Sequence, residues 1–468
     1  MRATVAAGLG AALSILSGCV AYVPPLVHQF NRGDLEQLRV GETTRTEAEA
    51  TLRSADWLRR ESSIEVAEES RNAGHFAAAL GVGGGVGTLT TQRYRILTAF
   101  DERNVLTRFE LEERSPEANP VPGRETHAFD APPPDSALVA HSGLPWIRGF
   151  HGLACGASAI AAVNVRQQVW LWRHGPGEPP IELAVPHAGL IRGLAFESGD
   201  DRLLCLSNEV ACIDLARIAA SRSKSIAKAP PAWIRKHAPG WLACVSPDGS
   251  RLVAAGPKKG VVVVLDAASG RELASWQATR GTIVDLAWSG DGRRVAVADA
   301  DFASFVVGVW DLGAGSPALE GGSQIARGRF TYAPAIRFSP DGRRLAVNCG
   351  THVEIWNLGP LDSGAGGGSA PGAPHLADAF LLPFGPEPGP IDYGVTSLAF
   401  SADGNRLAAT NTQGVVYDLA RSRRVWTHRW QAGQGAGYLN KIDFLPGTDR
   451  LVASSNRGVF SWSVSPTP

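Results

Sequence analysis

The segment Phe338–Asn357, FSPDGRRLAVNCGTHVEIWN, consists of three short apolar stretches separated by two turns. Its first turn, SPDG at Ser339–Gly342, predicts a hairpin, because glycine tolerates the positive φ that a tight turn needs. Its third stretch ends in the pair Trp356-Asn357. The same order of turn, "RL" or "RV" strand and closing pair recurs along the chain, so this segment is one copy of a repeat.

The repeat occurs seven times. Turns related to SPDG lie at Ser246–Gly249, Ser289–Gly292, Ser339–Gly342 and Ser401–Gly404, less regular ones at Glu197–Asp200 and Leu445–Thr448, and a shortened one after Leu153. The closing pairs are Trp172-Arg173, Ile213-Asp214, Leu265-Asp266, Trp310-Asp311, Trp356-Asn357, Tyr417-Asp418 and Trp462-Ser463. A period of ~40 to 45 residues with a Trp-Asp ending is typical of four-stranded propeller blades.

From Ala137 to Val464 the chain therefore resembles the WD-repeat family, and this resemblance implies a seven-bladed β-propeller. A small antiparallel sheet cannot bury its own faces, and stacking blades in a ring covers them. The sequence stops just after the third strand of unit seven, so we expect a strand from before unit one to complete the last blade. Ser136–His141 (SALVAH) is the predicted closing strand, as in WD-repeat proteins.

The first residues predict export. Arg2 precedes an apolar stretch, Ala3–Leu16, whose length fits a secretory signal. Leu16-Ser17-Gly18-Cys19 resembles the lipobox of bacterial lipoprotein precursors, which implies cleavage between Gly18 and Cys19 and acylation of the Cys19 thiol. Several acyl chains would anchor the protein without a transmembrane helix. Val20 after the cysteine favours the outer membrane of a Gram-negative-type envelope; an ordinary signal peptide or an uncleaved anchor is the alternative.

A second module precedes the propeller. Asp34–Leu52 has two short helical patterns around a turn at Val40–Thr43, and Thr44 and Glu47 are spaced as a capping box. Tyr94–Glu113 alternates apolar and polar residues about Asp101–Asn104 and predicts a hairpin. Two helices and a small sheet after a lipidated cysteine resemble the SmpA/OmlA family, which includes the BamE component of the β-barrel assembly machinery.

The predicted fold class is thus mainly β, a seven-bladed WD-repeat-like propeller preceded by a small α+β module. We expect the glycine-rich stretch Phe76–Thr90 to be a flexible loop, since it has neither a phosphate-loop Lys-Ser/Thr nor a full G-x-G-x-x-G. The expected segments are a signal peptide at 1–18, a lipidated tether at 19–33, the SmpA/OmlA-like module at 34–114, a proline-rich linker at 115–135 and the propeller at 136–464.

Two long insertions interrupt the repeat. Ala216–Pro231 carries Arg217, Arg222, Lys224 and Lys228, and is either a partner-binding loop or a solvated basic linker. The second insertion, Gly359–Gly394, contains AFLLPF at Ala379–Phe384, which we expect to be the outer strand of blade six.

No constellation of residues predicts catalysis, a cofactor or a metal. Asp248, Asp291, Asp341 and Asp403 recur at equivalent turn positions, which indicates structural turns. His141, His187 and His237 precede first blade strands, where WD-repeat proteins place a Gly-His pair; a metal site is the alternative. The aromatic residues on third strands, Trp170, Trp172, Trp310, Trp356 and Trp462, are expected between blades, with a stacked cofactor or sugar as the alternative.

Five cysteines remain besides Cys19, and they are expected in strands as buried thiols. A Cys205–Cys212 disulfide is the alternative. These two residues would face each other if Asn208-Glu209 formed a two-residue turn.

The charge balance is neutral, with 45 basic and 45 acidic residues, which argues against bulk attraction to nucleic acid.

We expect a non-enzymatic scaffold that binds proteins and is anchored by lipid to the outer membrane, where it faces the periplasm. Its expected partners are envelope proteins. By resemblance, envelope or outer-membrane-protein assembly is the process named first. The alternatives are a propeller enzyme of lactonase or quinone- or metal-dependent dehydrogenase type, and a protein that binds cell-wall glycan.

Overall fold

The computed structural model divides the chain into two compact units, residues 1–122 and 123–468, and each is described by itself. The boundary falls in the proline-rich stretch between the two predicted modules. The structure describes residues 20–23, 32–53, 56–60, 63–80, 83–113, 136–140, 150–173, 181–185, 189–191, 193–197, 200–207, 209–219, 226–228, 231–236, 242–301, 304–312, 323–329, 334–358, 374–382, 397–410, 413–428, 439–455 and 458–464.

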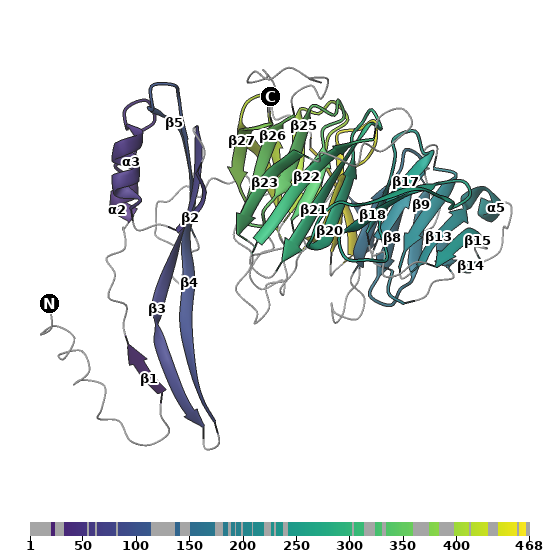
Figure 1. The fold of residues 1–468 in the computed structure, drawn as a ribbon, viewed down its shortest axis with the longest axis horizontal. Helices are drawn as coiled ribbons and strands as arrows, with labels where there is room; N and C mark the ends of the chain where they lie inside the picture. The colour runs from purple at the N-terminus through teal and green to yellow at the C-terminus, as the bar shows by residue number, and fades with distance from the viewer. Residues whose placement is uncertain are drawn as a thin grey trace, which may run out of the picture. The chain divides into compact units, whose positions relative to one another are not determined.

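In the described residues of the first unit, a five-stranded antiparallel sheet is accompanied by the short helices α2 (Arg32–Leu35) and α3 (Arg45–Thr51) (Figure 1). The strand order is β1-β3-β4-β5, and β2 also pairs with β3. The helices pack on the sheet through a small apolar core that includes Leu35, Ala48, Ile96 and Leu106. The strands are β1 (Val20–Val23), β2 (Asp56–Arg60), β3 (Ile64–Leu80), β4 (Gly83–Phe100) and β5 (Leu106–Glu113).

The predicted local signals of this unit are confirmed. The Thr44 backbone N–H donates to Glu47 Oε2 at 2.8 Å and the Glu47 N–H donates to Thr44 Oγ1 at 3.4 Å, which is the capping box of α3. The hairpin β4–β5 pairs Tyr94 with Glu113, and its turn is held by Asp101 Oδ1, which accepts from two backbone N–H groups.

The prediction of a flexible loop at Phe76–Thr90 is wrong. Most of this stretch belongs to a long hairpin, in which β3 and β4 pair down to Leu80 and Gly83, and β1 pairs with the end of β3. Glycine disfavours a strand because it has no side chain to pack, but it retains both backbone hydrogen-bonding groups, and the pairing uses those.

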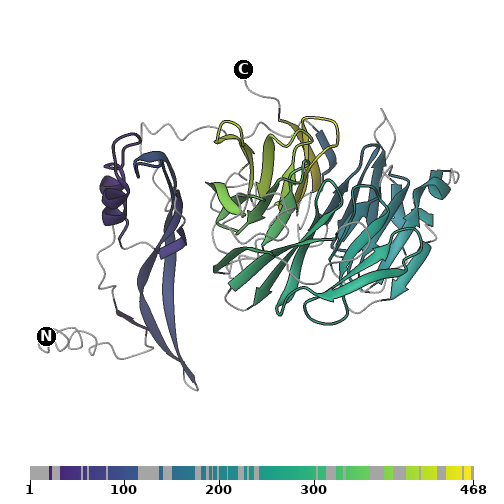
Figure 2. The same cartoon turned by 45° about the horizontal axis from the view of Figure 1, so that its top comes forward.

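The second unit is a ring of seven antiparallel blades (Figure 2). The innermost strands of consecutive blades contact one another, and that of blade seven contacts that of blade one. The strands, from inner to outer, are β7 (Phe150–Cys155), β8 (Ala159–Asn164), β9 (Val169–Arg173) and β10 (Ile181–Ala184) in blade one; β11 (Gly193–Phe196), β12 (Arg202–Leu206), β13 (Glu209–Asp214) and β15 (Pro231–Lys236) in blade two; β16 (Ala243–Val245), β17 (Arg251–Ala255), β18 (Val261–Asp266) and β19 (Glu272–Gln277) in blade three; β20 (Thr282–Trp288), β21 (Arg294–Asp301), β22 (Ser304–Asp311) and β23 (Ser323–Arg329) in blade four; β24 (Ala335–Phe338), β25 (Arg344–Asn348), β26 (His352–Asn357) and β27 (His375–Leu381) in blade five; β28 (Ser397–Phe400), β29 (Arg406–Thr410), β30 (Gly414–Asp418) and β31 (Arg423–His428) in blade six; and β32 (Leu439–Phe444), β33 (Arg450–Ser455), β34 (Gly458–Ser463) and β6 (Ser136–Ala140) in blade seven.

The predicted closure of the ring is confirmed. Strand β6 pairs with β34 as the outer strand of blade seven, with Val139 opposite Val459. The pairing carries a β-bulge in the outer strand, as does the pairing of third and outer strands in blades two to six. The segment from before blade one thus occupies the position that each other blade fills from its own repeat. His141 lies outside the described residues.

Both insertions differ from expectation. Ala379–Leu381 belong to β27, which pairs with β26 and is therefore the outer strand of blade five, not blade six. The basic insertion is more than a solvated linker. It contains helix α5 (Leu215–Ala219) and strand β14 (Ile226–Lys228), and β14 adds in parallel to β10 at the outer edge of blade one. An insertion from blade two thereby covers an edge that would otherwise expose unpaired backbone groups.

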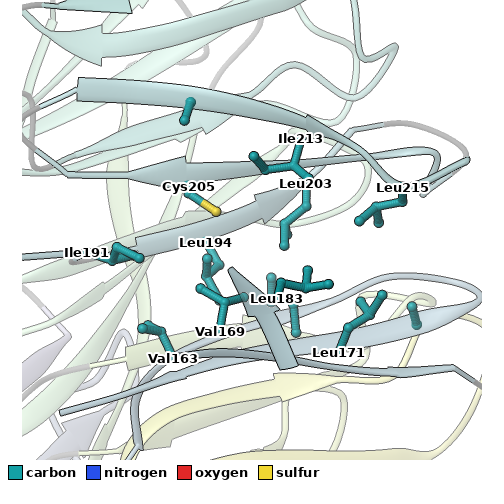
Figure 3. Close-up of a cluster of buried hydrophobic side chains, with 14 of the residues drawn as sticks. Val163, Val169, Leu171, Leu183, Ile191, Leu194, Leu203, Cys205, Ile213 and Leu215 are labelled. Carbon is teal, nitrogen blue, oxygen red and sulfur yellow. The ribbon is translucent and has the colours of Figure 1, made fainter. Parts of the chain in front are cut away.

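Apolar side chains fill the spaces between blades. Between blades one and two, Val169, Leu171 and Leu183 lie against Leu194 and Leu203 (Figure 3). Each face of a blade is thus covered by its neighbour, as the repeat predicts.

None of the described cysteines is in a disulfide, as predicted from the sequence. Cys205, Cys212 and Cys349 are buried, whereas Cys155 and Cys244 are only partly buried. In blade two, Cys205 lies opposite Ala211 and Cys212 opposite Leu204, so the pairing register is one residue away from the one that a disulfide needs. Because a one-residue shift turns a side chain to the other face of a strand, the two thiols belong to different cores, Cys205 between blades one and two and Cys212 between blades two and three.

Within the described part of the chain, no helix has the length and apolar character needed to cross a membrane.

Candidate functional site: the central channel

The channel is built by the innermost strands, which are joined by hydrogen bonds from side chains to the backbone of a neighbouring blade. A ring nitrogen of His151, in blade one, lies 2.7 Å from the Ile191 carbonyl at the start of blade two. Trp288 Nε1 donates to the Cys244 carbonyl across blades three and four at 3.1 Å. Asn440, in blade seven, donates to the Phe150 carbonyl and so links the last blade to the first. These hydrogen bonds connect neighbouring inner strands. They also give backbone carbonyl groups a hydrogen-bond donor.

The four predicted turn aspartates occupy the same position in the turns between first and second strands. In each turn the serine Oγ donates to the aspartate Oδ1 at 2.5 Å and accepts from the arginine N–H that begins the second strand. The glycine of each turn has φ between 68° and 71°, which explains the Asp-Gly sequence. The residues are Ser246, Asp248 and Gly249; Ser289, Asp291 and Gly292; Ser339, Asp341 and Gly342; and Ser401, Asp403 and Gly404.

Hydrogen bonds to the carboxylate lower the pKa of these aspartates. At Asp248 the donors are the Ser246 and Ser250 hydroxyls, and its pKa falls to about 2. At Asp403 the Ser401 hydroxyl is the main cause of the lowered pKa. Burial opposes the shift at Asp291 and Asp341, but hydrogen bonding outweighs it and their pKa values are also lowered. The hydrogen bonds within each turn therefore favour the ionised form of its aspartate.

The arginine that follows each of these turns joins neighbouring blades, a role that the sequence analysis does not predict. Arg251 Nη2 donates to the Gly292 carbonyl at 2.8 Å, Arg294 Nη1 to the Gly342 carbonyl at 3.4 Å and Arg344 Nη2 to the Gly404 carbonyl at 2.9 Å. Arg406 continues the series by donating to the Val464 carbonyl and to Asp449 in blade seven. We call Arg251, Arg294, Arg344 and Arg406 the latch arginines. Their constant position after the Asp-Gly turn is the sequence signal for them.

One turn has glycine where its relatives have proline or alanine. A Cβ at Gly290 would lie 1.9 Å from the Pro340 carbonyl oxygen of the next blade. The change from SPDG to SGDG therefore reflects a close backbone approach between blades four and five.

A cavity of about 330 Å³ occupies the channel. It extends from the middle of the inner strands to the turns at Gly290 and Ser339-Pro340. Its wall combines apolar residues with charged ones from blades four, five and seven. The lining includes Leu153, Leu194, Leu206, Trp288, Phe338, Leu398, Phe400, Asp285, Arg337, Lys441 and Asp443.

The charged groups are held by the inner strands. Asp285 Oδ2 accepts from Arg337 Nη1 at 2.9 Å and from the Ile336 N–H at 2.8 Å, which fixes the guanidinium across the boundary between blades four and five. Lys441 and Asp443 alternate with Ile442 on β32 and therefore point to the same face of that strand. Asp285, Arg337, Lys441 and Asp443 are called the channel charges below.

Desolvation and mutual interaction shift the pKa values of these groups. Asp285 raises the pKa of Arg337, which remains a cation. Burial lowers the pKa of Lys441. Burial raises the pKa of Asp443 to about 6, although Arg337 opposes the shift. The channel therefore holds a fixed ion pair beside two further groups. These are a lysine whose pKa is lowered by burial and a carboxylate, Asp443, whose charge changes near pH 6.

Other predicted residues are distributed around the ring. Trp172, Trp356 and Trp462 are buried, and Trp170 and Trp310 are partly buried against blade cores. Trp462 packs edge-on against Trp426 at 5.6 Å, which agrees with packing between blades six and seven. His141, His187, His237, Gly18 and Cys19 lie outside the described residues.

The channel charges are not predicted from the sequence, although a signal for them exists. VDLAW and AIRF each place one charged residue among the apolar residues of a first strand, and KIDF places two. Three such strands in a ring predict charges that converge on its axis, provided that the first strand is known to be innermost.

Comparison with known proteins adds evidence on the fold. No family model matches the sequence, and no curated protein matches it. Among solved structures, the propeller resembles the β-propeller domain of Myceliophteria thermophila Cps50 (Swd1), with a TM-score of 0.51, 17% identity, and coverage of 68% of this chain and 97% of that one. Together with its seven sheets, this likeness shows that the chain has the fold of a seven-bladed, WD-repeat-like β-propeller.

Proposed function

We propose that this protein is a lipid-anchored scaffold of the cell envelope that binds a protein partner at the mouth of the propeller channel. The lipid on Cys19 holds the chain at the outer membrane facing the periplasm, and the proline-rich linker gives the propeller reach. The process that we propose first is envelope or outer-membrane-protein assembly. The resemblance of residues 34–114 to the SmpA/OmlA family supports this choice.

The convergence of charged side chains on the channel carries the proposal. A charge on an inner strand is costly to desolvate, and burial here shifts the pKa values of both Lys441 and Asp443. The Asp285–Arg337 pair is joined at 2.9 Å, whereas neither Lys441 nor Asp443 is in an ion pair with another described residue. A partner segment that enters the mouth with a charged side chain would find an opposite charge and an apolar wall.

The two alternative functions lack support from the described residues. A metal- or quinone-dependent propeller enzyme predicts carboxylate, histidine and asparagine side chains at one channel mouth, whereas the described cavity lining has carboxylates with arginine and lysine. A glycan-binding face predicts exposed aromatic residues. The large apolar residues exposed in the described part are the aliphatic Val40, Val165, Leu190, Ile234 and Leu273.

The first test is a tagged pull-down from detergent-solubilised envelopes, with Cys19→Ser as the unanchored control. A stoichiometric protein partner recovered with the wild-type protein, and reduced with the soluble Cys19→Ser protein, supports an envelope-tethered scaffold. Recovery of no partner, with or without cross-linking, would remove the scaffold proposal.

The second test locates the binding face. Lys441→Gln and Asp443→Asn should each weaken partner recovery at least about fivefold, because a charge pair in a desolvated site contributes roughly 1 kcal/mol or more. Lys258→Gln, at an exposed loop of blade three, is the matched control and should bind as the wild type does. Equal recovery with all three variants would exclude the channel mouth as the binding face.

A further inference from the structure

We propose that the β25–β26 hairpin of blade five binds one Zn²⁺ ion through Cys349, His352 and Glu354. No metal site is predicted from the sequence, and the site proposed here is separate from the channel charges.

The three side chains are close together and buried. Their ligand atoms lie within 4.8 Å of one another, and the residues are 5%, 3% and 0% exposed, in chain order. His352 Nε2 and Glu354 Oε1 are 3.2 Å apart. Zinc bonds of ~2.0 to 2.3 Å in a tetrahedron separate ligand atoms by about 3.3 to 3.8 Å, so displacements of about 1 Å or less complete the set.

The backbone of the hairpin brings the ligands together. His352 and Glu354 are two residues apart on β26 and therefore project from the same face. Cys349 lies in the connecting turn, where its N–H donates to the His352 carbonyl at 2.9 Å. Gly350 makes this turn with φ of 84°, and its N–H is fixed by Asn348 Oδ1 at 2.9 Å. The three ligands thus come from six consecutive residues of a rigid turn.

Neighbouring side chains orient the ligands as the outer shell of a metal site does. Thr351 Oγ1 lies 2.9 Å from His352 Nδ1, which leaves Nε2 to face Glu354. Trp356 Nε1 donates to Glu354 Oε2 at 2.9 Å, which leaves Oε1 to face His352. In His352 and Glu354, one polar atom is thus hydrogen-bonded to a neighbouring side chain and the other faces the second ligand, while the Cys349 thiol donates to the Val347 carbonyl at 3.9 Å. This division of roles is characteristic of histidine and carboxylate ligands to zinc.

The charge balance favours a divalent cation. On binding, the Cys349 thiol loses its proton to solvent, and the thiolate and the Glu354 carboxylate together neutralise Zn²⁺. Nothing is oxidised or reduced. The mixed sulfur, nitrogen and oxygen ligand set suits zinc, with a water molecule as the fourth ligand. Because the ligands are buried, we expect the ion to enter as the blade folds.

The experiment uses the full chain, purified in chelator and then exposed to metal both as the native protein and during refolding. After desalting, the refolded protein should retain about one Zn²⁺ per chain by mass spectrometry. The Co²⁺ form should show a thiolate-to-cobalt charge-transfer band and the intense visible bands of tetrahedral cobalt. Cys349→Ser should lose the charge-transfer band, and Thr351→Val should weaken the metal affinity about 10-fold or more. Cys205→Ser, which removes a buried thiol elsewhere, should bind as the wild type does.

Two results would overturn the proposal. One is folded wild-type protein that retains less than about a tenth of an equivalent of Zn²⁺ after refolding with metal. The other is a Co²⁺ spectrum without a thiolate band, and this result decides the question even if Cys349→Ser does not fold. Either would leave Thr351, His352, Glu354 and Trp356 as a buried hydrogen-bonded chain without metal.

Discussion

At the residue scale, the repeated sequence encodes contacts between blades as well as turns within them. Serine and aspartate close each turn, glycine supplies its positive φ, and the latch arginine bonds to the turn of the next blade. One short motif therefore specifies both a hairpin and its attachment to a neighbour.

Arg344→Ala should lower the free energy of unfolding by about 1 to 2 kcal/mol, because the Gly404 carbonyl loses a charged donor. Guanidinium denaturation followed by tryptophan fluorescence measures the change. Arg343→Ala is the matched control, since Arg343 is exposed, and its effect should stay within about 0.5 kcal/mol. Equal effects of both substitutions would show that the latch contributes nothing.

The turn aspartates predict acid sensitivity. Their pKa values are lowered in the folded protein, so the stability they contribute is complete above the ordinary aspartate pKa and is lost as the pH falls through the folded value, about 2 for Asp248. Between pH 4 and pH 2 the wild-type protein should lose stability more steeply than Asp248→Ala. Thermal unfolding at half-unit pH steps tests this, and parallel curves for the two proteins would contradict it.

At the element scale, the sequence specifies the strands better than their pairing. The four regular Asp-Gly turns predict hairpins correctly, because glycine and aspartate act locally. The Cys205–Cys212 alternative fails because it depends on a single residue of register around Ser207–Glu209. Ala216–Pro231 is mispredicted for a related reason, because β14 is stabilised by pairing with β10, which lies outside that segment. Phe76–Thr90 contains both strands of a hairpin end, with Phe76 opposite Gly87 and Leu80 opposite Gly83, but its glycines disfavour a strand and therefore indicate a loop.

The closing strand gives the prediction at this scale. Deletion of Ser136–Ala140 should lower the free energy of unfolding by at least about 2 kcal/mol, because β34 loses its partner and becomes an open edge. The truncated protein should also self-associate, which sedimentation velocity would detect. Deletion of Glu117–Val121, of equal length in the proline-rich linker, is the control. A truncated protein as stable and as monomeric as this control would show that closure of the ring does not depend on β6.

At the scale of the whole molecule, the channel arises only when seven blades meet. Asp285, Arg337 and Asp443 lie far apart in the sequence, in blades four, five and seven. Periodicity predicts that a channel exists, but it does not indicate how deeply each charge is buried or which atoms pair. The fold was therefore largely predictable from the repeat, and the candidate site was not.

The channel predicts a second pH dependence, opposite in sign to that of the turns. Burial raises the pKa of Asp443 to about 6, so its contribution to stability is complete below the ordinary aspartate pKa and is lost as the pH rises through 6. Arg337, Lys441, Asp285 and the Cys155 thiol are its charged or titratable neighbours. Asp443→Asn should gain stability relative to the wild type between pH 4.5 and pH 7.5. The exposed Asp201→Asn control should show no such change, and a constant difference between Asp443→Asn and wild type would contradict the assignment.

The closing strand also determines when the propeller can complete its folding. Strand β6 is made before every other strand of the propeller, and its partner β34 is made last, more than three hundred residues later. The ring therefore cannot close until β34 has been made. Contacts of such long sequence separation form slowly. Until blade seven has been made, β6 has no partner strand. Early maturation is therefore the period in which this protein most needs protection from aggregation and proteolysis.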